Sequence, residues 1–319
     1  MTAPQTHHAL PIPNGWFAVA WSRDLEEGQV QRVQAFGREL VLFRARSGKP
    51  VVLDAYCPHL GAHLAVGGRV FGESIRCPFH GWRFDETGRC VEIPHCKKTI
   101  PGQARLRSWE LVEKNEMIFA WHHAEEKPPE WEIPTIDVIG HPDWTTPRRV
   151  DIDIAVHMQE LAENNFDPVH FEFVHGMPAP PASDYVFSQD GRFVRAESKV
   201  VRETPMGSFD TRLVRETFGL GLSTVVSDGI PGVGTMLFVS VTPIDAGHSK
   251  MRWLLTVTKN VADQVGEEFM TGIVKGVMDD VPIWENKIHR ERPVMSELDQ
   301  EIGEFRRWTR QFYSGLDGA

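Results

Sequence analysis

Two short segments, Cys57-Pro58-His59 and Cys77-Pro78-Phe79-His80, constrain this chain more than any other feature of its sequence. Each segment offers one thiolate and one imidazole, and residues 60–76 separate the two. Thiolates and imidazoles are the side chains with which proteins hold zinc and iron. The segments therefore predict two neighbouring loops that bind metal together.

Two kinds of metal site use this set of ligands. A structural zinc ion accepts two cysteines and two histidines, usually with two or more residues between the ligands of one loop. A Rieske [2Fe–2S] cluster has two cysteines on one iron and two histidines on the other. Only Pro58 separates Cys57 from His59, and each loop supplies one ligand of each type. The pattern favours the cluster over zinc, with Cys57, His59, Cys77 and His80 as its ligands.

The loops also indicate which kind of Rieske protein this is. Rieske proteins of the electron-transport complexes carry an extra cysteine in each loop, but Ala62 and Phe79 stand at these positions here. The loops instead resemble those of the Rieske oxygenases and their small ferredoxins. A ferredoxin needs only about 100 residues, an ordinary size for one domain, whereas this chain has 319. A pure electron carrier would leave most of the chain without a purpose.

A second candidate metal site contains His170 and His175, with Asp167 three residues earlier. Two histidines and one carboxylate form the facial triad that holds Fe(II) and leaves coordination positions open. Residues five apart do not share one face of a regular helix. We therefore expect a helix from about Val156 to end near His170, with His175 on the following turn and Gly176 supporting the stop. Either histidine alone would be better explained as an ordinary, partly buried residue.

Residues 164–175 match, without a gap, the pattern Asn-x-x-Asp-x-x-His-x-x-x-x-His. In this pattern, and over nearly its whole length, the chain resembles the catalytic subunits of Rieske non-haem iron ring-hydroxylating oxygenases. The resemblance implies that His170 and His175 bind a mononuclear Fe(II). It also implies that Asp167 bridges a Rieske histidine of a neighbouring subunit to this iron.

In the family, the third iron ligand is a carboxylate far downstream, and Asp280 is the candidate. The residues from Asp280 to Lys287 are similar to the Asp-x-x-Ile-Trp-x-x-Lys segment of one branch, which contains ketosteroid 9-hydroxylases and cholesterol-desaturating oxygenases. The closing residues 305–313 also resemble that branch. The adjacent Asp279 is the alternative ligand.

The resemblance implies a function as well. The chain would be the terminal oxygenase component of a monooxygenase that activates O2 at Fe(II) and hydroxylates a hydrophobic ring substrate, with a steroid among the candidates. It would form a homotrimer and draw electrons from a separate NAD(P)H-dependent reductase of flavin or ferredoxin type. An aryl-ether O-demethylase or an N-demethylase on the same scaffold is the alternative, because the chain is shorter than typical members of the branch. Outside this class, a Rieske electron-transfer protein and a zinc protein stay open.

The chain does not carry its own nicotinamide site. The glycine-rich residues 219–221 and 232–234 lack the third glycine and the strand-to-helix setting of a dinucleotide fingerprint. We interpret them as turns in a sheet. The reductase is therefore expected to be a separate protein.

The pattern of apolar residues predicts an α+β protein with two unequal domains. Short β-rich runs from about residue 16 to 121 predict a small antiparallel β domain, and the composition of residues 125–129 indicates a linker. Alternating patterns over about 185–258, followed by helical spacing over 262–292 and 298–312, predict a twisted antiparallel sheet covered by helices. The resemblance implies that this sheet is of the START-like or helix-grip type. We expect a Rieske domain at 1–140, with its core at about 16–125, and a catalytic domain at 141–319.

The composition of the chain limits the kinds of partner that it can bind. The net charge of −10 disfavours nucleic acid and anionic membranes, which both reward a basic surface. No apolar run reaches membrane-spanning length and no signal peptide is evident, so we expect a cytoplasmic protein without a membrane span. Cys90 and Cys96 are expected to be free thiols.

The substrate pocket is expected to be apolar. The strands carry the candidate lining residues, although most of them should be ordinary core residues. The candidates are Phe209, Phe218, Leu220, Leu222, Val225, Ile230, Met236, Phe238 and Trp253.

Overall fold

The computed structural model describes residues 10–204 and 207–315, which fall into two compact units. One unit comprises Trp16–Glu132, and the other comprises the described residues within Ile133–Ala319 and Met1–Gly15. The division lies before the boundary expected at residue 140, within the stretch that joins the last strand of the first unit to the first strand of the second.

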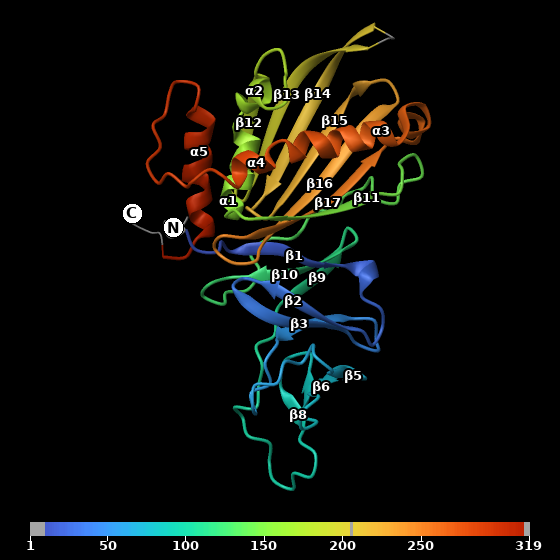
Figure 1. The fold of residues 1–319 in the computed structure, drawn as a ribbon, viewed down its shortest axis with the longest axis vertical. Helices are drawn as coiled ribbons and strands as arrows, with labels where there is room; N and C mark the ends of the chain where they lie inside the picture. The colour runs from blue at the N-terminus through green and yellow to red at the C-terminus, as the bar shows by residue number, and fades with distance from the viewer. Residues whose placement is uncertain (1–9, 205–206, 316–319) are drawn as a thin grey trace, which may run out of the picture. The chain divides into compact units, whose positions relative to one another are not determined.

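The unit Trp16–Glu132 is built from three small antiparallel sheets (Figure 1). Their strand orders are β1–β10–β9, β2–β3–β4 and β5–β6–β7–β8. A short 3-10 turn, η1 (Ser22–Asp24), follows the first strand. The strands are β1 (Gly15–Trp21), β2 (Val30–Ala35), β3 (Arg38–Arg44), β4 (Pro50–Asp54), β5 (Arg69–Phe71), β6 (Ser74–Arg76), β7 (Arg83–Asp85), β8 (Cys90–Glu92), β9 (Leu111–Lys114) and β10 (Met117–His122).

The apolar core of this unit includes the two candidate cluster cysteines. Val41 and Phe43 of β3 pack with Ile75 of β6, and all three are at most 1% exposed. Cys57 and Cys77 belong to the same buried cluster, each only 3% exposed. The two loops therefore begin inside the core, which fixes their starting points relative to each other.

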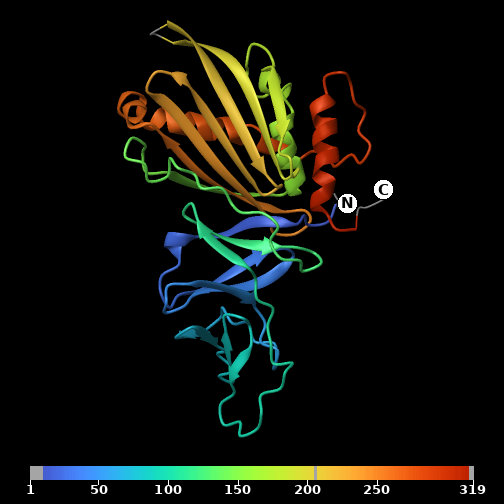
Figure 2. The same cartoon turned by 180° about the vertical axis from the view of Figure 1, so that it is seen from behind.

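The second unit is dominated by one antiparallel sheet of seven strands, in the order β11–β17–β16–β15–β14–β13–β12 (Figure 2). From β12 onward each strand pairs with the next in sequence, and β11 closes the sheet beside β17. The strands are β11 (Arg148–Ile154), β12 (Ser183–Phe187), β13 (Phe193–Thr204), β14 (Gly207–Phe218), β15 (Leu222–Ile230), β16 (Val233–Pro243) and β17 (Ser249–Val257). The predicted fold class, small antiparallel sheets followed by a large antiparallel sheet with helices, is confirmed.

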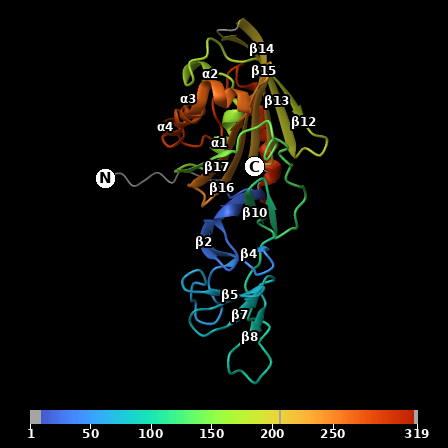
Figure 3. The same cartoon turned by 90° about the vertical axis from the view of Figure 1, so that its right-hand side faces the viewer.

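Helices cover one face of this sheet, as Figure 3 shows for α2, α3 and α4. Figure 1 shows the longest of them, α3, running across the strands. None of the helices in the described part of the chain is both long and apolar enough to span a membrane. The helical segments are α1 (Met158–Glu163), η2 (Asn164–Phe166), α2 (His170–Phe173), α3 (Lys259–Met278), α4 (Val281–Trp284), α5 (Gln300–Thr309) and η3 (Arg310–Phe312).

The helix expected over 262–292 is shorter than its apolar spacing suggested. The helix α3 ends at Met278, and α4 restarts at Val281 with Pro282 in its first turn. Proline lacks the N–H that a continuing helix requires, so it is tolerated at a helix start and not in the interior. The break leaves Asp280, the candidate iron ligand of this segment, at the junction between the two helices.

Candidate metal centres and substrate cavity

The two loops of the first unit have the same backbone fold. The amide of Gly61 donates to the carbonyl of Cys57 (2.9 Å), and the amide of Gly81 donates to that of Cys77 (3.2 Å). Both glycines have positive φ, 74° and 72°, a conformation that glycine adopts without a steric penalty. The repeated turn explains why the sequence repeats Cys-Pro and Gly at the same spacing in both loops.

These turns separate the thiols from the imidazoles. The cysteines are buried, whereas His59 and His80 are exposed and lie together, with ring centroids 4.7 Å apart. Trp82 stacks on His59 with a centroid distance of 4.6 Å and nearly parallel planes. Two inner thiols and two outer imidazoles are the arrangement that a Rieske cluster requires of its ligands.

The thiols fit a metal cluster chemically. Burial, with a smaller contribution from the neighbouring Cys77 thiol, raises the pKa of Cys57 to about 11. A thiolate at this depth is therefore favoured only when a metal cation compensates its charge. The four residues present suit a [2Fe–2S] cluster, with Cys57 and Cys77 for one iron and His59 and His80 for the other.

The second unit brings His170, His175 and Asp280 together, although Asp280 is far away in sequence. One ligand atom from each lies within 4.8 Å of the others, and no other group of this kind occurs in the described residues. The Nε2 atom of His175 is 3.4 Å from Oδ2 of Asp280. Two histidines and a carboxylate are the donor set of the facial triad for Fe(II). Of the two neighbouring aspartates, Asp280 is 4% exposed and faces the histidines, whereas Asp279 is exposed.

The helix expected from about Val156 to His170 is interrupted, and this part of the prediction was wrong. The segments α1 and η2 end at Phe166, and α2 begins only at His170. Pro168 explains the break because it cannot donate a helical hydrogen bond and pushes the preceding residue toward extended geometry. Asp167 is extended (φ −110°, ψ 91°).

Asp167 shapes the turn that presents His170. Its Oδ1 accepts hydrogen bonds from the amides of Val169 (3.1 Å) and His170 (3.2 Å). Its backbone carbonyl contacts Nδ1 of His170. A partner on Nδ1 fixes the ring and leaves Nε2 for a metal, as is usual for ligating histidines. Burial lowers the pKa of His170, which favours the neutral imidazole that binds metal.

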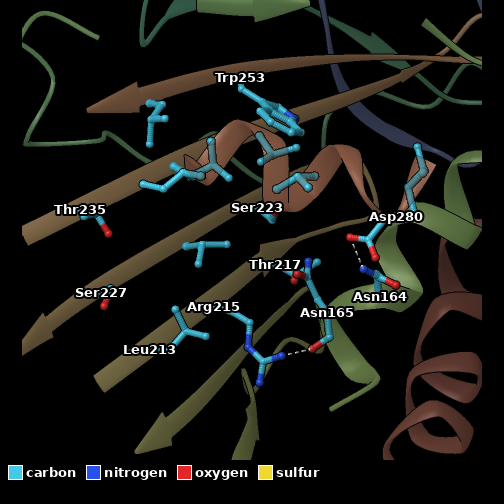
Figure 4. A pocket seen from close by; sticks show the side chains of 18 of the residues that line it. Asn164, Asn165, Leu213, Arg215, Thr217, Ser223, Ser227, Thr235, Trp253 and Asp280 are labelled. Atoms are coloured by element: carbon cyan, nitrogen blue, oxygen red, sulfur yellow. Dashed lines mark hydrogen bonds between the residues drawn. The ribbon is translucent and has the colours of Figure 1, made fainter. Parts of the chain in front are cut away.

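Asn164 links the two sides of the site, a role that the sequence did not reveal. Its Nδ2 donates to Oδ2 of Asp280 (3.2 Å), as Figure 4 shows. The same Nδ2 lies 3.2 Å from Nε2 of His170. Burial raises the pKa of Asp280 to about 6. A buried carboxyl group of this kind gains from a cation nearby, so the surroundings of Asp280 suit a metal ion. The only signal in the sequence was the position of Asn164 at the start of the motif.

A largely apolar cavity of about 490 Å³ adjoins the His–His–Asp group. The sheet forms its floor, and residues of α1, η2, α2, α3 and α4, together with His175, Met177 and Asp280 next to these helices, form the rest of its wall. Its size and composition are those of a site for a small molecule rather than a macromolecule. Both histidines and Asp280 line it, so a molecule in the cavity would lie beside a bound metal.

The sequence identified part of this lining. Of the expected residues, Leu220, Leu222, Val225, Ile230 and Trp253 line the cavity, whereas Phe209, Phe218, Met236 and Phe238 do not. Side chains alternate between the two faces of a strand. The lining on β14, β15 and β16 consists mainly of odd-numbered residues, so the even-numbered Phe218, Met236 and Phe238 are excluded from it. Phe209 lies on β14 beyond the part that lines the cavity.

Arg215 of β14 is another residue that sequence reasoning missed. It is 2% exposed and lines the cavity, and no carboxylate among the described residues pairs with it. Its guanidinium donates to the carbonyl of Asn165 (2.8 Å) and to the hydroxyls of Ser183 (2.8 Å) and Ser198 (3.2 Å). Arg215 therefore ties the turn before Asp167 to the sheet.

The remaining expectations concern cysteines and glycines. Cys90 and Cys96 are free thiols in the structure, the first buried and the second exposed. Residues 219–221 connect β14 to β15, and residues 231–232 connect β15 to β16. The glycine-rich stretches therefore include sheet turns, as interpreted from the sequence.

The fold and the two sites define an iron-dependent oxygenase, with residues for an iron–sulfur centre in one unit and residues for a mononuclear metal centre beside an apolar cavity in the other. Comparison with known proteins agrees. Residues 15–110 match the Rieske [2Fe-2S] domain, and residues 120–313 match the 3-Ketosteroid 9alpha-hydroxylase C-terminal domain. "Cholesterol 7-desaturase nvd 1" of Ciona intestinalis is 35% identical over 326 residues, covering 95% of this chain and 69% of the relative. A "Probable 3-ketosteroid-9-alpha-monooxygenase, oxygenase component" of Rhodococcus rhodochrous is 32% identical over 322 residues, covering 95% and 80%.

Two solved structures share the fold. Dicamba monooxygenase bound to dicamba has a TM-score of 0.77 at 19% identity, covering 95% of this chain and 98% of that one. The NdmA QL mutant of Pseudomonas putida CBB5 with caffeine has a TM-score of 0.76 at 20% identity, covering 92% and 89%. The chain belongs to the Rieske non-haem iron oxygenases, in the branch that joins a Rieske domain to the C-terminal domain of 3-ketosteroid 9alpha-hydroxylases. Its cofactors are a Rieske [2Fe–2S] cluster and, at the His–His–Asp site, a group of residues suited to mononuclear iron.

Proposed function

We propose that the chain is the terminal oxygenase component of a monooxygenase that hydroxylates a sterol or steroid. One observation carries the proposal: a mostly apolar cavity of about 490 Å³ is lined directly by His170, His175 and Asp280. An apolar cavity with few polar groups takes a hydrophobic ring compound. The relatives named for cholesterol and for 3-ketosteroids support the choice of ring.

Each predicted site residue then has a role. Cys57, Cys77, His59 and His80 would hold the cluster, and His170, His175 and Asp280 would hold the mononuclear iron. The two iron centres together supply the reductive activation of O2, in which a C–H bond, O2, two electrons and two protons give an alcohol and water. The residues of the chain bind the substrate against the sheet, orient His170 through Asp167, and exclude water with the apolar lining.

Electrons would arrive from a separate reductase, as membership of this class implies. Within the oxygenase, we propose a homotrimer in which a Rieske histidine of one subunit meets Asp167 of the next. Two observations support it. The cluster loops expose Leu60 (64%) and Phe79 (62%) next to the exposed His59 and His80, and such apolar exposure is typical of a contact surface. Asp167 keeps a side-chain exposure of 33%.

Single-turnover oxidation tests the function without knowledge of the reductase. The iron-loaded protein, with its cluster chemically reduced, is mixed with 18O2 and either cholesterol or a 3-ketosteroid. We expect a product that carries one 18O atom and forms once per active site. The Asp280→Ala variant, with its cluster intact, is the matched control and should form none.

A demethylase would give a different outcome. Release of formaldehyde from an aryl methyl ether or an N-methylated heterocycle, with no oxidation of either steroid, would overturn the proposal in favour of the alternative expected from the sequence. Dicamba monooxygenase and NdmA share only the fold with this chain, at 19% and 20% identity. The steroid arm therefore has the stronger support.

A further inference from the structure

The floor of the cavity contains a polar pair in an apolar setting. Thr217 of β14 and Ser223 of β15 are directly opposite each other across the two strands. Both line the cavity, and they are only 3% and 8% exposed. The next residues across the sheet in the same row are Val239 and then Trp253, which also line it. Two hydroxyl-bearing residues thus face each other across neighbouring strands in the floor of a mostly apolar cavity, which Arg215, Ser227 and Thr235 also line.

Neither hydroxyl has a partner within the described part of the chain, where no hydrogen bond from the side chain of Thr217 or Ser223 is found. Buried hydroxyls are normally hydrogen-bonded, because an unpaired polar group away from bulk water is unfavourable. Valine or alanine would fill both positions without this penalty. Because both hydroxyls line the cavity, a partner from outside the protein, either water or a bound molecule, can reach them.

A second pair of hydroxyls on the same face shows the difference. Ser227 of β15 and Thr235 of β16 are also paired across strands and line the cavity. They are only half-buried, so bulk water can satisfy them. Ser223 and Ser227 are four residues apart on β15, or about 13 Å at the rise of a strand. Figure 4 shows Thr217 and Ser223 on the side nearer Asp280, and Ser227 and Thr235 at the far side.

We infer that Thr217 and Ser223 are specificity-determining residues that hold a neutral oxygen of the substrate, a hydroxyl or a ketone, near the carbon that reacts. A hydroxyl side chain can both donate and accept, so the pair takes either group. The pair is uncharged, which suits a neutral oxygen. The nearby guanidinium of Arg215 donates to Asn165, Ser183 and Ser198, and its buried Nε has no partner in the described residues. The inference rests on the proposed function, which it extends from a ring skeleton to the position of its oxygen.

Binding of matched probes by equilibrium dialysis tests the inference on the full-length protein. The first pair is a 3-ketosteroid and the same ring skeleton without oxygen. The second pair is 1-naphthol and naphthalene, which separates recognition of the oxygen from recognition of the steroid. The wild type should bind the oxygenated member of at least one pair about tenfold more tightly, the size expected for one or two neutral hydrogen bonds.

The variants assign this preference to residues. The double variant Thr217→Val/Ser223→Ala should lose it, whereas Thr217→Ser, which keeps the hydroxyl, should retain it. Thr224→Val is the matched control, because Thr224 is 4% exposed, its hydroxyl has no partner in the described structure, and it does not line the cavity. Visible absorption of the cluster verifies that each variant is folded.

Each outcome decides between the ideas. The inference is overturned if Thr217→Val/Ser223→Ala still binds the oxygenated probe more tightly, or if this preference is lost instead in Ser227→Ala/Thr235→Val. In both cases, binding of the steroid would still support the proposed function. If only 1-naphthol is preferred over naphthalene, recognition of an oxygen by Thr217 and Ser223 is supported, but a steroid is excluded as the substrate. Equal binding of both members in both pairs overturns the inference, and no binding of any probe to the wild type overturns both ideas.

Discussion

The Nζ atom of Lys287 lies 2.6 Å from Oε2 of Glu160, a carboxylate that is only 2% exposed. The other oxygen of Glu160 lies 2.7 Å from Nδ1 of His289. One turn later in α1, Glu163 pairs with Arg306 of α5 at 2.6 Å. These contacts join α1, which leads into the motif with His170, to the segment that follows Asp280. They hold together the two parts of the chain that supply the candidate iron ligands.

The Glu160→Gln substitution should therefore weaken the protein. It removes the charge that Lys287 and His289 share and leaves their donors without a carboxylate in a buried place. Removing one partner of a buried ion pair typically costs about 3 kcal/mol. The urea concentration at the midpoint of unfolding should be lower than in the wild type, as measured by the fluorescence of the second unit.

Asp245→Asn is the matched control for this change. Asp245 also pairs with a histidine, with Oδ1 2.9 Å from Nδ1 of His248, but both side chains are at least half exposed. An exposed pair of this kind contributes less than about 1 kcal/mol. Equal losses in the two variants would show that burial of Glu160 has no special effect.

The same carboxylate predicts a dependence of stability on pH. Burial acts to raise the pKa of Glu160, but the hydrogen bonds and positive charges of His289 and Lys287 outweigh it and lower the pKa from 4.5 to about 2. Because the folded-state pKa is below the unfolded one, the stabilisation is complete above about pH 4.5 and is lost as the pH falls toward 2. The difference in unfolding midpoint between wild type and Glu160→Gln should be constant from about pH 7 to 5 and then shrink. A difference that grows on acidification would contradict this sign.

Iron analysis distinguishes the two neighbouring aspartates. Asp280→Ala should keep the visible and EPR spectra of the cluster while the mononuclear iron is lost, so that total iron falls from about three to two per chain. Asp279→Ala should retain the full amount, because the side chain of Asp279 is exposed. If Asp279→Ala loses the mononuclear iron and Asp280→Ala retains it, Asp279 is the ligand instead.

Asp167→Asn separates two roles of one residue. The asparagine oxygen can still accept from the amides of Val169 and His170, so the turn and both metals should be retained. If the carboxylate carries the link between subunits, turnover should fall at least about a hundredfold, the upper range for losses at groups that support metal ligands. Single-turnover product measured beside total iron tests this prediction. Full activity with full iron would remove Asp167 from the electron path.

Local chemistry explains which features were predictable. The cluster loops depend on residue types at short spacing, so Cys57 and His80 could be identified from the sequence alone. The helix before His170 was predicted too long because its apolar spacing continues past Pro168, although this proline marks the break that the structure shows. Asn164 was visible as part of a motif, but its contact with Asp280 depends on a fold that joins distant segments.

The pocket was harder to predict than the metal sites. Aromatic residues such as Phe218 and Phe238 suggested an apolar cavity, yet they do not line it. The register of each strand decides which face a side chain occupies, and a shift of one residue reverses the assignment. The sequence gives no signal that singles out Thr217 and Ser223, because isolated hydroxyl residues are common in strands. Their pairing and burial become visible only in the sheet.

The alternation of the seven-stranded sheet has a consequence for how such enzymes diversify. Ser223 touches the cavity, and its neighbour Thr224 belongs to the opposite side. Replacements at every second position can therefore change what the enzyme accepts while the intervening residues keep the scaffold intact. A library restricted to Thr217, Ser223, Val225 and Leu237 would explore new substrates at little risk to folding.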